Sequence, residues 1–186
     1  MPFYLFENIT QETCKRFFEW VESKDAFDDE MLICSAGGGC SFSYAIIDWI
    51  KSNYTFDVDA EIRKIQTHQV KWTGINRFHT TATGYAHSGA LLILSSGTNG
   101  CRKAYKHSTF MLHQPILKID GNVSKLTTDL ISLENDYDTY CEILAENTGK
   151  TALEIKNLID SAPNNTITLN AKQALEFGII DEIIGG

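Results

Sequence analysis

The spacing of hydrophobic and polar residues predicts short strands and helices that alternate along the chain. The apolar run 31–34 is too short for a helix and leads into the small residues 35–39, which predicts a buried strand that ends in a tight loop. A strand at 79–83, a turn of small residues and a buried helix at 90–94 repeat that order. Such alternation is typical of an α/β fold, in which helices cover the faces of a sheet.

The helical spacing of apolar residues, and residues that favour helix ends, predict further helices and strands. Asn8 or Thr10 can cap a helix with one apolar face, and Gly149 can end a long helix over 122–147. We further expect a helix over 41–50, a helix after Thr151, strands at 102–105, 109–112 and 116–120, and a turn at Asn164 and Asn165.

Composition narrows the class of protein. The 186 residues suit one domain, 1–186, and 43% apolar and 22% charged residues are ordinary values for a globular protein. A net charge of −8 disfavours nucleic acid as a partner, and no apolar run is long enough to span a membrane. The five cysteines form no C-x-x-C pair or metal-like spacing, and the first residues do not resemble a secretory signal. We therefore expect reduced thiols, no bound metal and a cytoplasmic location.

Ser88 and His113 are the candidate catalytic residues. The Ser88 hydroxyl would stand at the N-terminus of the helix at 90–94, where free N–H groups can stabilise an oxyanion; the alternative is a serine that only caps this helix. His113 ends the strand at 109–112, which would project it from a rigid support; the alternative is a hydrogen-bonded core histidine. Serine before histidine is neither the chymotrypsin nor the subtilisin order, and Ser88 lacks the G-x-S-x-G of α/β-hydrolases.

The segment around Ser88 resembles a known family. Residues 84–89 are similar to the nucleophile motif G-x-A-A-S-M-G of the ClpP proteolytic subunits, with His87 in place of the second alanine and Gly89 in place of methionine. Residues 97–102 resemble the family's G-x-x-G-x-R segment, and 108–115 resemble its N-S-x-x-M-I-H-Q-P stretch. The similarity extends to 36–38, 45–48, 148–149 and 171–181, so it covers most of the chain.

The resemblance implies a ClpP/crotonase-like α/β fold with the long helix as a handle. It also implies a serine endopeptidase that cleaves unfolded peptides or proteins through an acyl-enzyme and needs no cofactor. Carried over residue by residue, it makes Ser88 the nucleophile and His113 the general base. The backbone N–H groups of Gly38 and Gly89 would form the oxyanion hole.

The third catalytic residue differs from the family pattern. Where the family has its triad aspartate, this chain has Asn164-Asn165-Thr166 after an apparent insertion. Asn165 could orient His113 through its side-chain oxygen, as asparagine does in papain-like proteases. Thr166, Asp160 or no residue at all are the alternatives, and the two asparagines could form only a turn.

Family resemblance also implies a homo-oligomeric ring, heptameric or stacked in two. Residues 52–77 are longer than the corresponding link of the family, and we expect this insertion to lie near the substrate cleft. The chain lacks the segment that lines the axial pore of ClpP rings, which disfavours docking of an AAA+ unfoldase.

Three alternative functions follow from these departures. A phage-type protease that matures capsid proteins without an ATPase fits the missing pore segment. A catalytically silent ring subunit fits the missing aspartate. An acyl-CoA enzyme of the crotonase family would share the fold, although the stretch His113-Gln114-Pro115 disfavours it.

Overall fold

The computed structural model describes residues 1–23, 28–54, 77–116 and 122–185. Within these residues, seven strands form one sheet with the order β1-β2-β3-β4-β7, and β5 pairs with both β3 and β6. Every pairing is parallel except that of β5 with β6. The strands are β1 (Phe3–Leu5), β2 (Asp28–Ser35), β3 (Arg77–His87), β4 (Arg102–Tyr105), β5 (Thr109–His113), β6 (Thr166–Asn170) and β7 (Glu182–Ile184).

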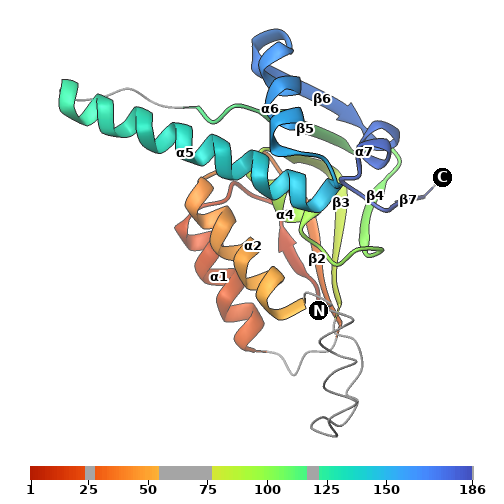
Figure 1. Cartoon of the computed structure of the whole chain (residues 1–186). Coiled ribbons are helices and arrows are strands. Elements are labelled where there is room, and N and C mark those ends of the chain that lie inside the picture. Colours follow the sequence, from red (N-terminus) through yellow and green to blue (C-terminus); the bar gives the residue numbers. More distant parts are fainter. Residues whose placement is uncertain (24–27, 55–76, 117–121, 186) are drawn as a thin grey trace, which may run out of the picture.

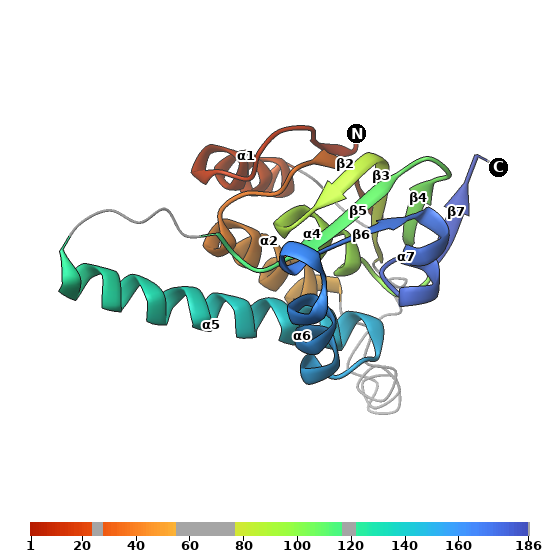
Figure 2. The same cartoon turned by 90° about the horizontal axis from the view of Figure 1, so that it is seen from above.

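Helices follow most of the strands, and one of them projects from the molecule. Figures 1 and 2 both show the N-terminal part of α5 extending beyond the body of the protein, while its C-terminal part packs against α4 and α6. The helices are α1 (Gln11–Glu22), α2 (Cys40–Tyr54), α4 (Gly89–Ser95), α5 (Val123–Thr148), α6 (Ala152–Ser161) and α7 (Ala171–Phe177). The α/β architecture with a long handle helix is confirmed.

Local signals account for most helix ends. The side chain of Thr10 accepts a hydrogen bond from the Thr13 N–H and so caps α1, and Thr151 caps α6 in a capping box with Glu154. Gly149 follows α5 with φ 71°, the left-handed conformation in which glycine is favoured.

Strand β3 is longer than the sequence predicts. The turn expected between the strand at 79–83 and the helix at 90–94 is shorter than predicted and falls at Ser88, because 84–87 continue the strand and pair with β5 through Tyr85–Thr109 and His87–Met111. The strand expected at 116–120 is not confirmed, since Ile116 lies outside β5 and 117–120 lie outside the described residues. Most of the insertion at 52–77, from 55 to 76, also lies outside them.

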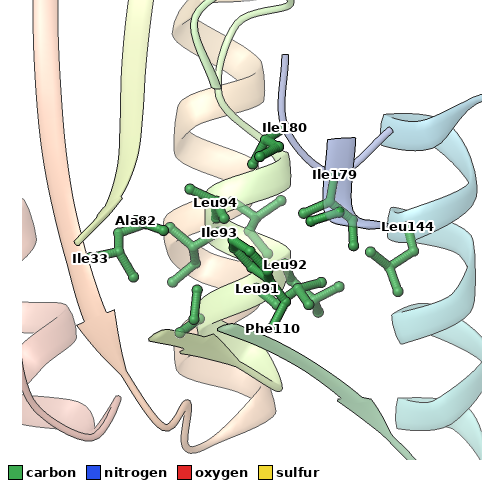
Figure 3. Close-up of a cluster of buried hydrophobic side chains, with 14 of the residues drawn as sticks. Ile33, Ala82, Leu91, Leu92, Ile93, Leu94, Phe110, Leu144, Ile179 and Ile180 are labelled. Carbon is green, nitrogen blue, oxygen red and sulfur yellow. The ribbon is translucent and has the colours of Figure 1, made fainter. Parts of the chain in front are cut away.

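Helix α4 forms the centre of the hydrophobic core. All seven of its residues are buried, since β3 lies on one side of the helix and α2 and α5 cover the others. Figure 3 shows Leu91 to Leu94 among side chains from β2, β3, β5 and α5, together with Ile179 and Ile180. A helix that is apolar all round must be enclosed in this way. The residue that precedes α4, Ser88, therefore stands on a rigid support.

A buried ion pair ties β4 to the segment before β7. The Asp181 carboxylate accepts hydrogen bonds from Arg102 Nε at 2.9 Å and from the Gly100 N–H at 2.8 Å. The guanidinium also donates to the Asn147 carbonyl at 2.7 Å, and Arg102 is only 6% exposed. Burial alone would raise the pKa of Asp181, but the hydrogen bonds and charge of Arg102 and the bond from Gly100 together lower it.

Replacing Asp181 with asparagine is therefore expected to lower the free energy of unfolding by about 3 kcal/mol at neutral pH, because it leaves the Arg102 charge buried and unpaired. Since the pKa of Asp181 is lower in the folded protein than in the unfolded chain, the carboxylate stabilises the fold above its unfolded pKa. This stabilisation is lost as the pH falls through the folded pKa. Urea unfolding at a series of pH values should show a smaller loss of stability on acidification in the variant than in the wild type.

Glu182→Gln is the matched control, because Glu182 follows Asp181 directly and pairs with the more exposed Lys103 at 2.8 Å. We expect it to change stability by less than about 1 kcal/mol. Equal losses in the two variants would contradict the structural role assigned to Arg102 and Asp181.

Candidate active site

Ser88 occupies a sharp turn between a strand and a helix. Its backbone has φ 53° and ψ −126°, a conformation that residues other than glycine rarely adopt. The Ser88 N–H donates to the Met111 carbonyl at 2.9 Å, which fixes the turn to β5. No hydrogen bond of the described residues joins the Ser88 side chain to the helix it precedes. The hydroxyl is thus held in a strained turn and does not cap α4.

The glycine-rich loop after β2 packs directly against this turn. Ile9 lies beside the loop, donating to the Gly37 carbonyl at 2.8 Å and accepting from the Gly39 N–H at 2.9 Å. Gly37 has φ 90°, and a Cβ there would lie 2.6 Å from the His87 oxygen and 2.8 Å from Ser88 Cβ. Only a residue without a side chain fits between β2 and the turn.

The two predicted oxyanion donors are Gly38, in the loop after β2, and Gly89, which follows Ser88 in the chain. Gly38 must be a glycine because a Cβ there would overlap the backbone of Ile9, and Gly89 because a Cβ would overlap the Ser43 hydroxyl. Within the described part of the chain, neither the Gly38 N–H nor the Gly89 N–H has a hydrogen-bond partner. Both groups are therefore free to donate.

His113 reaches the same end of the sheet from β5. Because β3 and β5 are parallel, the side chains that follow their ends emerge at one edge. Ser88, His113 and Gly38 all line one pocket of about 710 Å³. Its other walls come from the start of α2, from Pro115 and Ile116, and from α5, which contributes Lys125, Asp129, Ser132, Leu133 and Asp136.

The structure brings Ser88, His113 and Gly38 together but does not join the first two. Among the described residues no hydrogen bond links the Ser88 hydroxyl to the His113 ring, and Gly89 lies beside the pocket and not in its wall. Catalytic hydrogen bonds often form only when substrate binds, so this separation is compatible with a resting site.

None of the candidates for the third catalytic residue is bonded to His113 in the described structure. Asn165 instead donates from Nδ2 to the side-chain oxygen of Gln114 at 3.0 Å, and Asp160 accepts from Gln114 Nε2 at 2.8 Å. Thr166 Oγ1 donates to the Asn164 carbonyl. His113 Nδ1 lies 2.5 Å from the main-chain oxygen of Gln114.

His87, the residue that replaces a small residue of the family motif, lies on the same strand face as Tyr85 and does not line the pocket. Its Nε2 lies 3.4 Å from Thr109 Oγ1, and the centres of its ring and that of Tyr85 are 5.0 Å apart. Burial, and secondarily the charge that His113 carries when protonated, lower the pKa of His87. His87 is therefore predominantly neutral at pH 7.

Two residues of the site escape prediction from the sequence. Gly37 supports the Ser88 turn through a contact between segments about fifty residues apart, which only the folded chain reveals. Gln114 contacts His113 through its main chain, and only its place in the resembling stretch 108–115 draws attention to it.

The described residues also show whether metal sites, disulfides and membrane-spanning helices occur among them. They contain no cluster of three or more histidine, cysteine or acidic side chains that could hold a metal ion, and none of the five cysteines forms a disulfide there. In the same part of the chain, no helix has both the length and the apolar character needed to cross a membrane.

Comparison with known proteins extends these observations. The model of the Clp protease family matches residues 70–186, which include Ser88 and His113. An ATP-dependent Clp protease proteolytic subunit 2 of Rhodococcus jostii is 33% identical over 178 residues, covering 96% of this chain and 78% of that protein. A subunit 1 of Corynebacterium glutamicum is 35% identical over 105 residues, and a Clp protease proteolytic subunit-like protein of Synechocystis is 33% identical over 106 residues. These two matches span about half the length of the relatives, 49% and 45%.

The parallel sheet, the buried helix that follows β3 and the pocket at its N-terminal end define an α/β protein of the ClpP/crotonase type. With a family model that matches more than half of the chain and a relative aligned over almost all of it, the chain belongs to the Clp protease family.

Proposed function

We propose that this protein is a serine-type peptidase that cleaves peptides or unfolded proteins through an acyl-enzyme. Ser88 is the nucleophile and His113 the general base, and the N–H groups of Gly38 and Gly89 are the oxyanion donors. The observation that carries the proposal is the strained Ser88 turn, whose hydroxyl does not cap α4 and lies in one pocket with His113 and Gly38.

The chemistry of each step follows from these positions. Ser88 Oγ attacks the carbonyl carbon of the scissile peptide bond while its proton moves to His113 Nε2, and the negative oxygen that results accepts hydrogen bonds from the two glycine N–H groups. The C–N bond then breaks, and the proton moves from His113 to the leaving amine. A water molecule then attacks the acyl carbon while His113 takes its proton, the bond from that carbon to Ser88 Oγ breaks, and the proton passes from His113 to the Ser88 oxygen.

Covalent labelling with a fluorophosphonate probe tests this proposal. We expect the wild-type protein to be labelled and Ser88→Ala to remain unlabelled, because only an activated serine attacks phosphorus at a useful rate. Ser41→Ala is the matched control, since Ser41 lines the same pocket and should be dispensable. Labelling that survives in Ser88→Ala, or that disappears in Ser41→Ala, would contradict the assignment.

A second candidate function is that of a catalytically silent subunit. The absence of a Ser88–His113 hydrogen bond among the described residues, and of a carboxylate bonded to His113, favours it. This alternative would be established if the wild-type protein were folded and associated with other copies of the chain but were not labelled by the fluorophosphonate probe.

We also propose that copies of this chain assemble into a ring through their exposed apolar surfaces. Leu130, Ile131 and Val123 of the projecting α5 are 49%, 58% and 80% exposed, and Leu153 and Leu158 of α6 are also exposed. Association of copies would remove these side chains from water.

A further inference from the structure

The contact between His113 and Gln114 determines which nitrogen of the imidazole carries the proton. His113 Nδ1 lies 2.5 Å from the main-chain oxygen of Gln114. A carbonyl oxygen can only accept, so Nδ1 is the donor, and in the neutral ring the lone pair is on Nε2. A general base that takes the proton of Ser88 through Nε2 requires this tautomer.

Gln114 is fixed in turn by a network that reaches the short 3₁₀ helix Pro163–Asn165, which precedes β6, and the helices α5 and α6. Its N–H donates to the Asn165 carbonyl at 3.3 Å, and its side-chain oxygen accepts from Asn165 Nδ2 at 3.0 Å. Its Nε2 donates to Asp160 Oδ1 at 2.8 Å, and the same oxygen accepts from the Tyr137 hydroxyl at 2.7 Å. Every polar group of the Gln114 side chain thus has a partner.

The proline after Gln114 adds a further constraint. A residue that precedes proline is restricted to extended conformations, because the proline ring collides with its backbone in the helical region. Pro115 therefore narrows the directions that the Gln114 carbonyl can take, and the hydrogen bonds that Gln114 accepts from Asn165 and donates to Asp160 select among them.

We propose that the main-chain carbonyl of Gln114 orients His113 in place of a triad carboxylate, and that Asn165 and Asp160 are positioning residues that hold this carbonyl. This inference rests on the proposed function, in which His113 is the base. It differs from the direct role predicted for Asn165, because the side chain of Asn165 is bonded to Gln114 and not to the imidazole.

Asn165→Asp separates these two roles. An aspartate that contacted His113 would restore a carboxylate to the site and raise kcat. An aspartate that faces Gln114 has no side-chain N–H to donate to the Gln114 side-chain oxygen. If the Gln114 amide rotates so that its NH₂ group donates to the new carboxylate, the amide oxygen then faces the Asp160 carboxylate, and two acceptors repel each other. We therefore expect kcat for a fluorogenic peptide to fall by about tenfold to a hundredfold, with KM changed by less than about threefold.

Asn164→Asp is the matched control. Asn164 and Asn165 both have positive φ, 54° and 49°, but Asn164 is exposed and its side chain makes no hydrogen bond within the described residues. We expect kcat of this variant to stay within about twofold of the wild type. A kcat of Asn165→Asp that is unchanged or raised, or a fall of equal size in both variants, would overturn the proposal.

The tautomer of His113 can be measured without any assay of activity. In the wild-type protein labelled with ¹⁵N-histidine, the neutral His113 ring should show the Nδ1–H tautomer, with its signals identified by their loss in His113→Gln. The Nε2–H tautomer would overturn the proposal even if Asn165→Asp failed to fold. An Nδ1–H tautomer in a protein that no fluorophosphonate labels would instead reject the proposed function and leave only the hydrogen bond between His113 and Gln114 established.

Discussion

Replacement of His113 by alanine is expected to lower kcat/KM for peptide hydrolysis by about 10⁴-fold or more. Without the imidazole, Ser88 loses the group proposed to accept its proton, and a neutral serine is a poor nucleophile. Because Ser88 and the oxyanion donors remain, a small residual rate above that of the uncatalysed reaction should persist. Steady-state hydrolysis of a fluorogenic peptide, followed over time at high enzyme concentration, measures both quantities.

His87→Ala provides the control for this prediction. His87 lies near His113 on the neighbouring strand but outside the wall of the pocket, and burial keeps its pKa low. We expect its loss to change kcat/KM by less than about threefold. If His87→Ala reduced the rate as strongly as His113→Ala, the identity of the general base would have to be reassigned.

Gly37→Ala is expected to damage both stability and catalysis. The new Cβ would lie 2.6 Å from the His87 oxygen and 2.8 Å from Ser88 Cβ, and the residue would have to keep φ 90°. The steric overlap and the unfavourable backbone conformation together predict a loss of about 3 kcal/mol in the free energy of unfolding. Displacement of Ser88 by a fraction of an ångström to one ångström should also lower kcat by about a hundredfold. Urea unfolding and steady-state kinetics on the same preparation measure the two effects.

Gly100→Ala isolates the contribution of the backbone conformation. Gly100 has a similar φ of 82°, but no atom lies within 4 Å of a Cβ built there. We expect this variant to lose about 1 kcal/mol of stability and to retain its kcat. Similar behaviour of the two glycine variants would show that the loop after β2 does not position Ser88.

The sequence predicts the order of the elements well because their signals are local. Thr10 (one of the two residues expected to cap the first helix), Thr151 and Gly149 cap or end helices through contacts within a few residues, and each does so in the structure. The buried helix near 90–94 is also confirmed, as α4, because an uninterrupted apolar run has to be enclosed.

Elements that depend on distant partners are harder to predict. Residues 84–87 contain small residues that favour a turn, but pairing with β2 on one side and β5 on the other extends them into β3. Strands β1 and β7 are three residues each, too short for a pattern, and form only because β2 and β4 offer free edges.

The residues of the candidate active site also differ in how far the sequence predicts them. Ser88 and His113 could be predicted because they lie in segments that resemble a family motif, and the structure places both at one pocket. The contact of Gly37 with the Ser88 turn and the bonds of Asn165 to Gln114 join residues that are about fifty positions apart. No spacing along the chain encodes such contacts, so the bonding partner of His113 Nδ1 could not be predicted.

Trapping the acyl-enzyme tests the nucleophilic role of Ser88 most directly. The protein is mixed with an activated peptide ester, quenched with acid during turnover and digested with trypsin, and the peptide from Phe78 to Arg102 is fragmented in a mass spectrometer. We expect an acyl group on Ser88 in the wild type and a greatly reduced amount in His113→Ala. An acyl group on another residue, or turnover without any acylated protein, would contradict this role of Ser88.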